Sequence, residues 1–300
     1  MPEPSGIEPA VICIRLVQYA GAAALMGSSL LFVYAVPGGL PADDARRARR
    51  WIAFAAALLA IASLLAIALQ GSLFGGSLAD GFTSESFMLV ASSMSLGTAA
   101  LVRAGLAALA CLALLALPVG RAGFLAAGTL GTLAAASLAW LGHGASRDGW
   151  LPIGGDVLHV LAASLWIGAL FGFAPLLRGA REEAGIARLR VALDRFSALG
   201  LPLVAVLALS GAANTLYVVG PDHLGGLPST PYGRLLLAKL AAFAAMLALA
   251  ALNRWRLTPA LARREGGSAG RLRASVGIEA ALGAAVLALV AWLGTLEPFV

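Results

Sequence analysis

The sequence predicts an all-α integral membrane protein, a polytopic bundle of about eight transmembrane helices. Hydrophobic residues make up 60% of the 300-residue chain and charged residues only 12%, which is too apolar for one water-soluble core. The apolar residues fall in long runs, and a spanning helix needs about 20 of them in succession. Most basic residues lie between those runs, so the net charge of +6 reflects topology and gives no support to nucleic-acid binding.

Eight runs are long enough to span a bilayer, and only short connections separate them. In order they cover 11–35, 51–71, 98–117, 123–141, 153–176, 196–218, 233–252 and 275–295. We therefore expect residues 1–300 to form a single transmembrane domain, with the first run kept as a permanent helix. An offset of 136 residues lays 95–117 over 231–252. This weak repeat indicates either two parallel four-helix halves or a chance similarity of small residues.

The arginines predict how the bundle is oriented. The connections 43–50, Arg121, 178–195 and 253–273 hold 16 of the 21 basic residues, and with eight spans all four lie on one side. The positive-inside rule places that side in the cytoplasm. Both termini are then expected outside the cytoplasm.

Three charged residues, Arg103, Lys239 and Glu279, fall well inside the predicted spans rather than near their ends. Arg103 and Lys239 occupy equivalent places in the repeat, about two turns from the outer end. Such a cation is costly unless it snorkels to the interface or pairs with a buried acid or an anionic group, and both outcomes remain open. Glu279 is expected in the inner half of the last span, too deep for a direct bridge to Lys239.

All the histidines lie at or beyond the outer ends of spans 4, 5 and 6: they are His143, His159 and His223. In the segment DVLHVLAASLWIGAL (156–170), Asp156 precedes His159 by one turn, so both share a face that points into the bundle. A short loop joins spans 4 and 5, which should bring His143 to a similar depth. Neutral imidazole is a good ligand for copper and zinc, and a nearby carboxylate can ligate or orient the ring.

Other roles for these side chains remain open. Asp156 can cap its helix while His159 hydrogen-bonds a neighbouring helix, and a proton or quinone role is a further alternative. Met88 and Met94 of the outer segment 80–97 offer thioethers, which favour Cu(I), although loop packing is their simpler role. His223 is expected to be an ordinary loop histidine. Cys111 and Met246 have similar expected depths and could form an inner relay.

Several segments together resemble the copper resistance protein D (CopD) family of bacterial inner-membrane proteins. GHGASRDGWLPIGGDVLHVLAASLWIGAL (142–170) looks like the family signature, and RFSALGLPLVAVLALSGAANTLYVV (195–219) is similar to its FS-to-G-to-N helix. The stretch 229–261 resembles the T-x-YG-x-LL-x-K segment, and 275–298 resembles the closing helix with an internal glutamate. The resemblance runs from about 140 to 298. The first half matches only in hydropathy and in the piece LGTAALVR.

The resemblance implies a multi-pass inner-membrane protein that binds copper, Cu(I) or Cu(II), at a periplasm-facing site and imports or transfers it. A periplasmic copper-binding protein of the CopC type is the implied partner. The residues to which it points are His143, Asp156, His159, Asn214, Tyr232, Lys239, Asn253 and Glu279. We expect metal transport or homeostasis rather than catalysis, and no catalytic residue is assigned. Because the candidate ligands stop near the outer face, a redox or sensing protein that does not conduct copper is the alternative.

Overall fold

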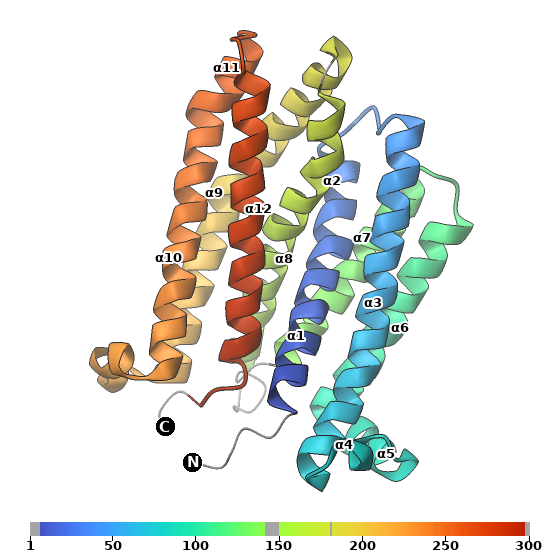
Figure 1. Ribbon diagram of the computed structural model, residues 1–300, viewed down its shortest axis with the longest axis vertical. Helices are drawn as coiled ribbons and strands as arrows, with labels where there is room; N and C mark the ends of the chain where they lie inside the picture. Colours follow the sequence, from blue (N-terminus) through green and yellow to red (C-terminus); the bar gives the residue numbers. More distant parts are fainter. Residues whose placement is uncertain (1–6, 142–149, 181, 298–300) are drawn as a thin grey trace.

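The computed structural model describes residues 7–141, 150–180 and 182–297, and within these ranges its regular structure is entirely helical (Figure 1). The predicted all-α bundle is confirmed, because eight helical segments of the described chain are long and apolar enough to cross a membrane. These segments are Glu8–Tyr34, Ala42–Gly75, Ser95–Ala116, Arg121–Leu141, Leu151–Gly179, Glu183–Val219, Pro231–Ala262 and Ser268–Leu293.

Several spans are built from more than one helical element. The elements are α1 (Glu8–Ala23), the π-helical turn η1 (Ala24–Ser28), α2 (Ser29–Tyr34), α3 (Ala42–Gly75), α4 (Leu78–Gly81), α5 (Ser84–Ser93), α6 (Ser95–Ala116), α7 (Arg121–Ala136), the 3-10 turn η2 (Ser137–Leu141), α8 (Trp150–Gly179), α9 (Glu183–Val219), the 3-10 segment η4 (Pro221–Ser229), α10 (Pro231–Leu252), the π-helical turn η5 (Asn253–Leu257), α11 (Thr258–Ala262) and α12 (Ser268–Leu293).

The spans run alternately up and down, so α1 begins and α12 ends at the same end of the bundle (Figure 1). We call this the terminal end, and the opposite one the arginine end. The connections 43–50, Arg121, 178–195 and 253–273 all lie at the arginine end, as expected from an even number of spans. Arginines there also hold other helices: Arg195 donates to the Tyr34 carbonyl (3.0 Å) and Arg273 to the Leu177 carbonyl (3.0 Å).

All three of the longer basic connections are largely helical, and 253–273 contains η5, α11 and the start of α12. α3 begins at Ala42 rather than near 51, and α9 begins at Glu183 rather than near 196. Acidic residues in both first turns stabilise these extensions, because carboxylates interact favourably with the positive end of a helix. At the terminal end, most of the outer segment 80–97 is helical and includes α5 and the start of α6.

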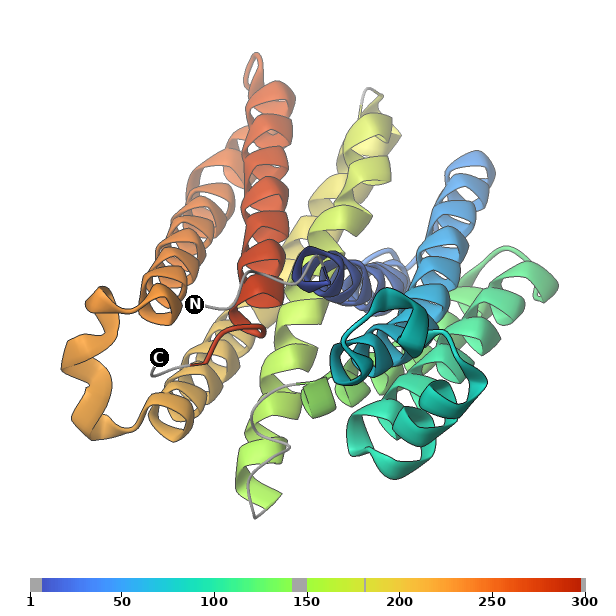
Figure 2. The same ribbon diagram turned by 60° about the horizontal axis from the view of Figure 1, so that its bottom comes forward.

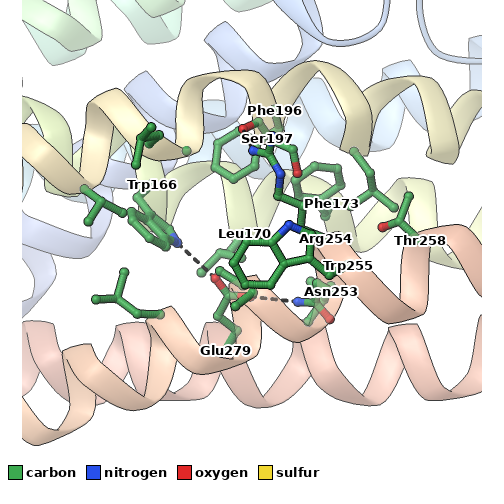
Figure 3. A pocket seen from close by; sticks show the side chains of 18 residues that line it. Trp166, Leu170, Phe173, Phe196, Ser197, Asn253, Arg254, Trp255, Thr258 and Glu279 are labelled. Atoms are coloured by element: carbon green, nitrogen blue, oxygen red, sulfur yellow. Dashed lines mark hydrogen bonds between the residues drawn. The ribbon is translucent and has the colours of Figure 1, made fainter.

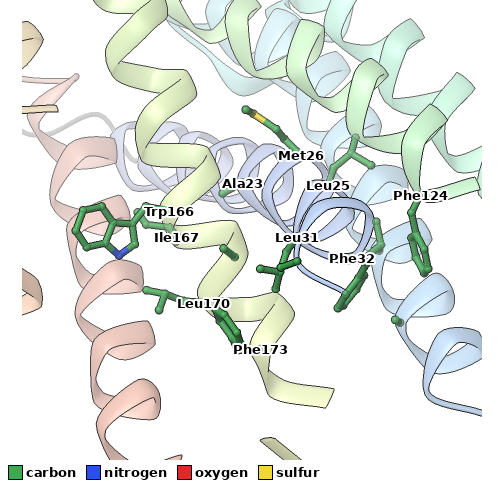
Figure 4. Packing of buried hydrophobic residues seen from close by; sticks show 14 of the residues in the cluster. Ala23, Leu25, Met26, Leu31, Phe32, Phe124, Trp166, Ile167, Leu170 and Phe173 are labelled. Atoms are coloured by element: carbon green, nitrogen blue, oxygen red, sulfur yellow. The ribbon is translucent and has the colours of Figure 1, made fainter. Parts of the chain in front are cut away.

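The first and fifth spans cross at the centre of the bundle (Figure 4), and glycines lie at their closest contacts. A Cβ on Gly168 of α8 would lie 1.8 Å from the Ala23 carbonyl oxygen, and one on Gly27 would lie 2.5 Å from the Ser164 carbonyl oxygen. The Ser28 hydroxyl donates to the Gly168 carbonyl at 2.5 Å. Only residues without side chains let the two backbones approach this closely.

The two halves of the chain differ in how their second and third spans pack. α3 lies along α6, whereas α9 packs on α8 and α10 packs on α12, with little contact between α9 and α10 (Figure 2). Two cavities lie between the helices of this more open C-terminal half. We call them the His159 cavity, toward the terminal end, and the Glu279 cavity, toward the arginine end.

Candidate functional site

The His159 cavity is a mainly apolar space of about 540 Å³ between α8, α9, α10 and α12. His159, Ala163 and Trp166 of α8 all line it, which confirms that the histidine-bearing face of this helix points into the bundle. Lys239 of α10 and Thr215 of α9 add polar groups to the same wall. The cavity thus combines a ligand-type side chain with a low-dielectric surrounding.

His159 is hydrogen-bonded to α9 through its ring nitrogen Nδ1, and the partner's own hydrogen bond favours one neutral tautomer. His159 Nδ1 lies 3.0 Å from Ser210 Oγ, and the Ser210 hydroxyl donates its proton to the Val206 carbonyl at 2.5 Å. A serine hydroxyl has one proton to give, so its oxygen accepts from Nδ1–H of the neutral ring. Nε2 then carries a lone pair, which is the form that binds a metal ion.

The helix α9 also leaves room for this imidazole. A Cβ on Gly211 would lie 3.3 Å from His159 Cε1, tighter than ordinary van der Waals contact. Ser210 and Gly211 therefore act together, because one orients the ring and the other lets it lie close to the α9 backbone.

Asp156 lies one turn before His159, toward the terminal end. It interacts electrostatically with Lys239 and Tyr232 of α10 and with Tyr19 of α1. Asn214 of α9 faces the same end of α8, since its Oδ1 would be 3.3 Å from a Cβ on Gly155. Of the two roles left open for Lys239, interaction with an acid, the partly buried Asp156, is therefore the one that the structure supports.

Of the other members of the predicted metal site, the two methionines are not brought to His159. His143 lies outside the described residues. Met88 of α5 is 62% exposed, and Met94 packs on a separate cluster that includes Val90 and Ala91. Because α5 packs against α3, α4 and α6, both methionines lie in the other half of the bundle (Figure 1). In the described ranges, no three His, Cys, Asp or Glu side chains are grouped closely enough to hold a metal ion.

His223 lies in η4 at the terminal end and is exposed. Its neighbour Leu224 lines the His159 cavity, so η4 contributes to the cavity wall at the terminal end. The structure therefore places His223 beside the cavity wall, without showing it among the residues that line the space.

Arg103 corrects an expectation. Of the outcomes left open for it, snorkelling is excluded, because its side chain is fully buried, at 0% exposure, and its guanidinium donates to Ser137 Oγ (3.1 Å) and to the Ser137 carbonyl (3.4 Å). Tyr19 lies close enough to interact with it electrostatically. Arg103 thus belongs to the packing of α6 against η2, and it does not line either cavity of the C-terminal half.

The second cavity, of about 330 Å³, contains the intramembrane glutamate (Figure 3). Trp166 Nε1–H donates to Glu279 Oε1 and Asn253 Nδ2–H donates to Glu279 Oε2, each at 3.0 Å. The expectation that Glu279 lies too deep to bridge Lys239 fits this arrangement, because Lys239 lines the other cavity. Trp166 lines both cavities, so its indole stands between them.

Sequence reasoning missed two residues that line these cavities, Trp166 and Met246, and one that orients His159, Ser210. Ser210 and Trp166 carried no signal of their own, since their partners lie 51 and 113 residues away in the chain. Met246, expected to pack or to pair with Cys111, is 3% exposed and lines the His159 cavity. The suggested inner relay between Cys111 and Met246 is wrong, because their helices, α6 and α10, lie on opposite sides of the bundle (Figure 1).

Comparison with known proteins adds an independent result. The family model described as copper resistance protein D matches residues 190–293, and the one described as copper resistance protein D-like, N-terminal domain, matches residues 5–155. The chain is 35% identical to Copper resistance protein D of Pseudomonas syringae pv. tomato over 97% of both chains. It is 32% identical to the Inner membrane protein YebZ of Escherichia coli (strain K12), over 54% of this chain and 56% of that protein. No solved structure matches the chain.

Proposed function

Because the chain belongs to the copper resistance protein D family of inner-membrane proteins, we propose that it binds copper in the His159 cavity and imports or transfers it. His159 is the central ligand in this proposal, and Asp156 and His143 complete the site from the terminal end. Met246, which lines the same cavity, would supply a soft thioether suited to Cu(I). Copper is the cargo of this site.

The observation that carries the proposal is the orientation of the His159 ring. We assign the ring proton to Nδ1, which is hydrogen-bonded to Ser210, so that Nε2 is the ligating atom. A histidine that served only to join two helices would not need a cavity in front of it. Asp156 offsets the positive charge of Lys239, which would otherwise repel a bound cation.

The end of the bundle that bears the site supports a periplasmic source of copper. The His159 cavity lies toward the end opposite the arginines, and the positive-inside rule assigns the arginine end to the cytoplasm. A periplasmic copper-binding protein of the CopC type would then dock at the terminal end, on the surface that includes η4.

The test is the Cu(I) affinity of the purified protein in detergent at neutral pH, measured by competition with a chromophoric chelator. His159→Ala and His143→Ala should each abolish tight binding, and Met246→Leu should weaken it. His223→Ala serves as the matched control at the same end of the bundle. Equal copper content in wild type and His159→Ala would refute the proposed site.

One observation favours the alternative of a copper-binding redox or sensing protein that does not conduct the ion. The residues lining the Glu279 cavity include no histidine, cysteine or methionine, so the described part of the path offers no soft ligand beyond Trp166. Copper entry into protein-containing liposomes separates the two functions. Tight binding without entry would favour the redox or sensing role.

A further inference from the structure

The Glu279 cavity holds a buried carboxylate whose described hydrogen-bond partners are neutral. Glu279 is 3% exposed, and its two oxygens accept from an indole N–H and an amide N–H (Figure 3). Acidic residues inside membrane spans are costly and generally mark ion or proton pathways. A structural role alone would be filled at lower cost by a glutamine, which accepts and donates without a charge.

The second observation is that the side-chain amide of Asn253, which binds Glu279, has an oxygen that is unpaired among the described residues. Its Nδ2 donates to Glu279, while its Oδ1 is buried and has no hydrogen-bond partner in the described part of the protein. A buried amide oxygen without a hydrogen bond costs free energy. Asn253 Oδ1 is therefore an acceptor beside the carboxylate that can still take up a hydrogen bond. Rotation of the amide about its terminal bond would exchange Nδ2 for Oδ1. Asn253 would then accept a hydrogen bond from a protonated Glu279.

We propose that Glu279 is a proton-exchanging carboxylate, reached from the arginine end, whose charged and protonated states are both held by Asn253. In the charged state Asn253 and Trp166 donate to the two carboxylate oxygens. When a proton from water in the cavity forms an O–H bond on Oε2, the Asn253 amide turns and accepts it. No electron moves in this step, and the proton returns to water when the O–H bond breaks.

The surroundings suit a proton better than a copper ion. Both partners of Glu279 aim hydrogens at its oxygens, and those hydrogens would repel a metal cation. The same cavity offers no soft sulfur or imidazole ligand. A proton needs only an acceptor oxygen and a partner for the new O–H group, and Glu279 and Asn253 provide both.

Glu279 forms no ion pair with the described residues, because the charged side chains near α12 have other partners or lie elsewhere. Arg254 is the charged side chain that shares the cavity with Glu279, and it donates to the Ser197 carbonyl at 2.7 Å. Lys239 of α10 and His159 of α8 line the other cavity, and Arg15 of α1 lies against Gly294 near the end of α12. Arg178 of α8 lines a separate cavity at the arginine end.

Trp166 gives the carboxylate a link to the copper site. Its indole lines both cavities, packs edge-on against Phe243 at a centroid distance of 6.1 Å, and donates to Glu279. Opening the passage between the cavities requires the ring to move, which breaks the bond to Glu279. Protonation, which removes the negative charge that holds Nε1–H, weakens that bond. We therefore expect Glu279 to release its proton when Trp166 closes the passage between the two cavities. This coupling of proton release to copper movement rests on the proposed copper function.

The first experiment follows the protonation of Glu279 directly. Infrared difference spectra of the protein in lipid should show a buried carboxylic-acid C=O band that titrates with pH and disappears in Glu279→Gln. The glutamine variant should fold, because its amide can accept from Trp166 and donate to a turned Asn253. Asn253→Leu should shift the band, since the partner of the O–H group is lost, while Glu265→Gln, at an exposed site, should leave it unchanged. The proposal is overturned if no band is lost in Glu279→Gln.

The second experiment measures copper entry and internal pH together in liposomes. Wild type should move protons when copper enters, and Glu279→Gln should reduce the proton signal at least tenfold while copper bound at the outer site stays constant. If wild type admits no copper but the infrared band still titrates, the transport function fails and the proton site stands. If copper enters with no proton movement, or with the same proton movement in Glu279→Gln, the coupling to copper is wrong.

Discussion

The two ring nitrogens of His159 have different surroundings. Nδ1 is hydrogen-bonded to Ser210, and we propose that Nε2 is the nitrogen that binds copper. In the tautomer that donates from Nδ1 to Ser210 Oγ, Nε2 is the ring nitrogen whose lone pair is available to a metal ion. The sequence indicated that His159 was a candidate ligand, because histidine, aspartate and helical spacing are local features. Ser210 could not be found in this way, since it lies 51 residues further along and carries no metal-binding group.

Ser210→Ala should lower copper affinity by about 10- to 100-fold, the usual effect of losing a partner that orients a metal-bound histidine. The ring would then be free to turn or to change tautomer. Competition for Cu(I) at neutral pH measures the loss, and Ser210→Thr, which keeps the hydroxyl, should recover most of it. Ser275→Ala removes a buried hydroxyl from α12 and serves as the control. Unchanged affinity in Ser210→Ala would mean that Ser210 does not set the ligating nitrogen.

Gly211→Val should disturb the same ring sterically. A Cβ there already lies 3.3 Å from His159 Cε1, so the branched side chain would push the imidazole toward the cavity. We expect weaker copper binding with a nearly unchanged melting temperature, because Gly211 is a partly exposed helical position. Gly200→Val on the same helix is the control, since no atom lies within 4 Å of its Cβ position. Equal affinities in the two variants would contradict the proposed position of the ring.

At the scale of the helices, the number and order of spans could be predicted because each span is a long apolar run. What joins the spans was harder to foresee. α3 and α9 extend beyond their apolar runs because their first turns carry acidic residues, and a hydropathy pattern does not register such extensions. Arg103 was misjudged for a similar reason, since its partner Ser137 lies on another span.

The crossing of α1 and α8 predicts a sharp sensitivity to size. Gly168→Ala would place a methyl group 1.8 Å from the Ala23 carbonyl oxygen, which forces the two helices apart. Overpacking of this kind costs roughly 1–3 kcal/mol of unfolding free energy, so the melting temperature in detergent should fall by several degrees. Gly277→Ala on α12, where a Cβ meets nothing within 4 Å, should leave it unchanged. If both variants melt alike, the close approach of the two helices is not present in solution.

At the scale of the whole molecule, the sequence showed the asymmetry of charge but not the asymmetry of packing. The basic connections could be assigned to one end by counting spans. The more open arrangement of α9 and α10, which accommodates both cavities, depends on how distant helices pack and left no periodic signal. Family likeness is also broader than the motifs suggested, because the N-terminal half matches a family model of its own over residues 5–155.

The orientation of the bundle follows from its arginine end and can be tested by labelling. In a background of Cys13→Ser and Cys111→Ser, single cysteines would be introduced as His223→Cys at the terminal end and Ala187→Cys at the arginine end, both exposed positions. A membrane-impermeant maleimide applied to spheroplasts should label position 223, whereas position 187 should react only after lysis, because the positive-inside rule keeps the arginines in the cytoplasm. The opposite pattern would place the His159 cavity on the cytoplasmic side, and the proposed capture of periplasmic copper would then be wrong.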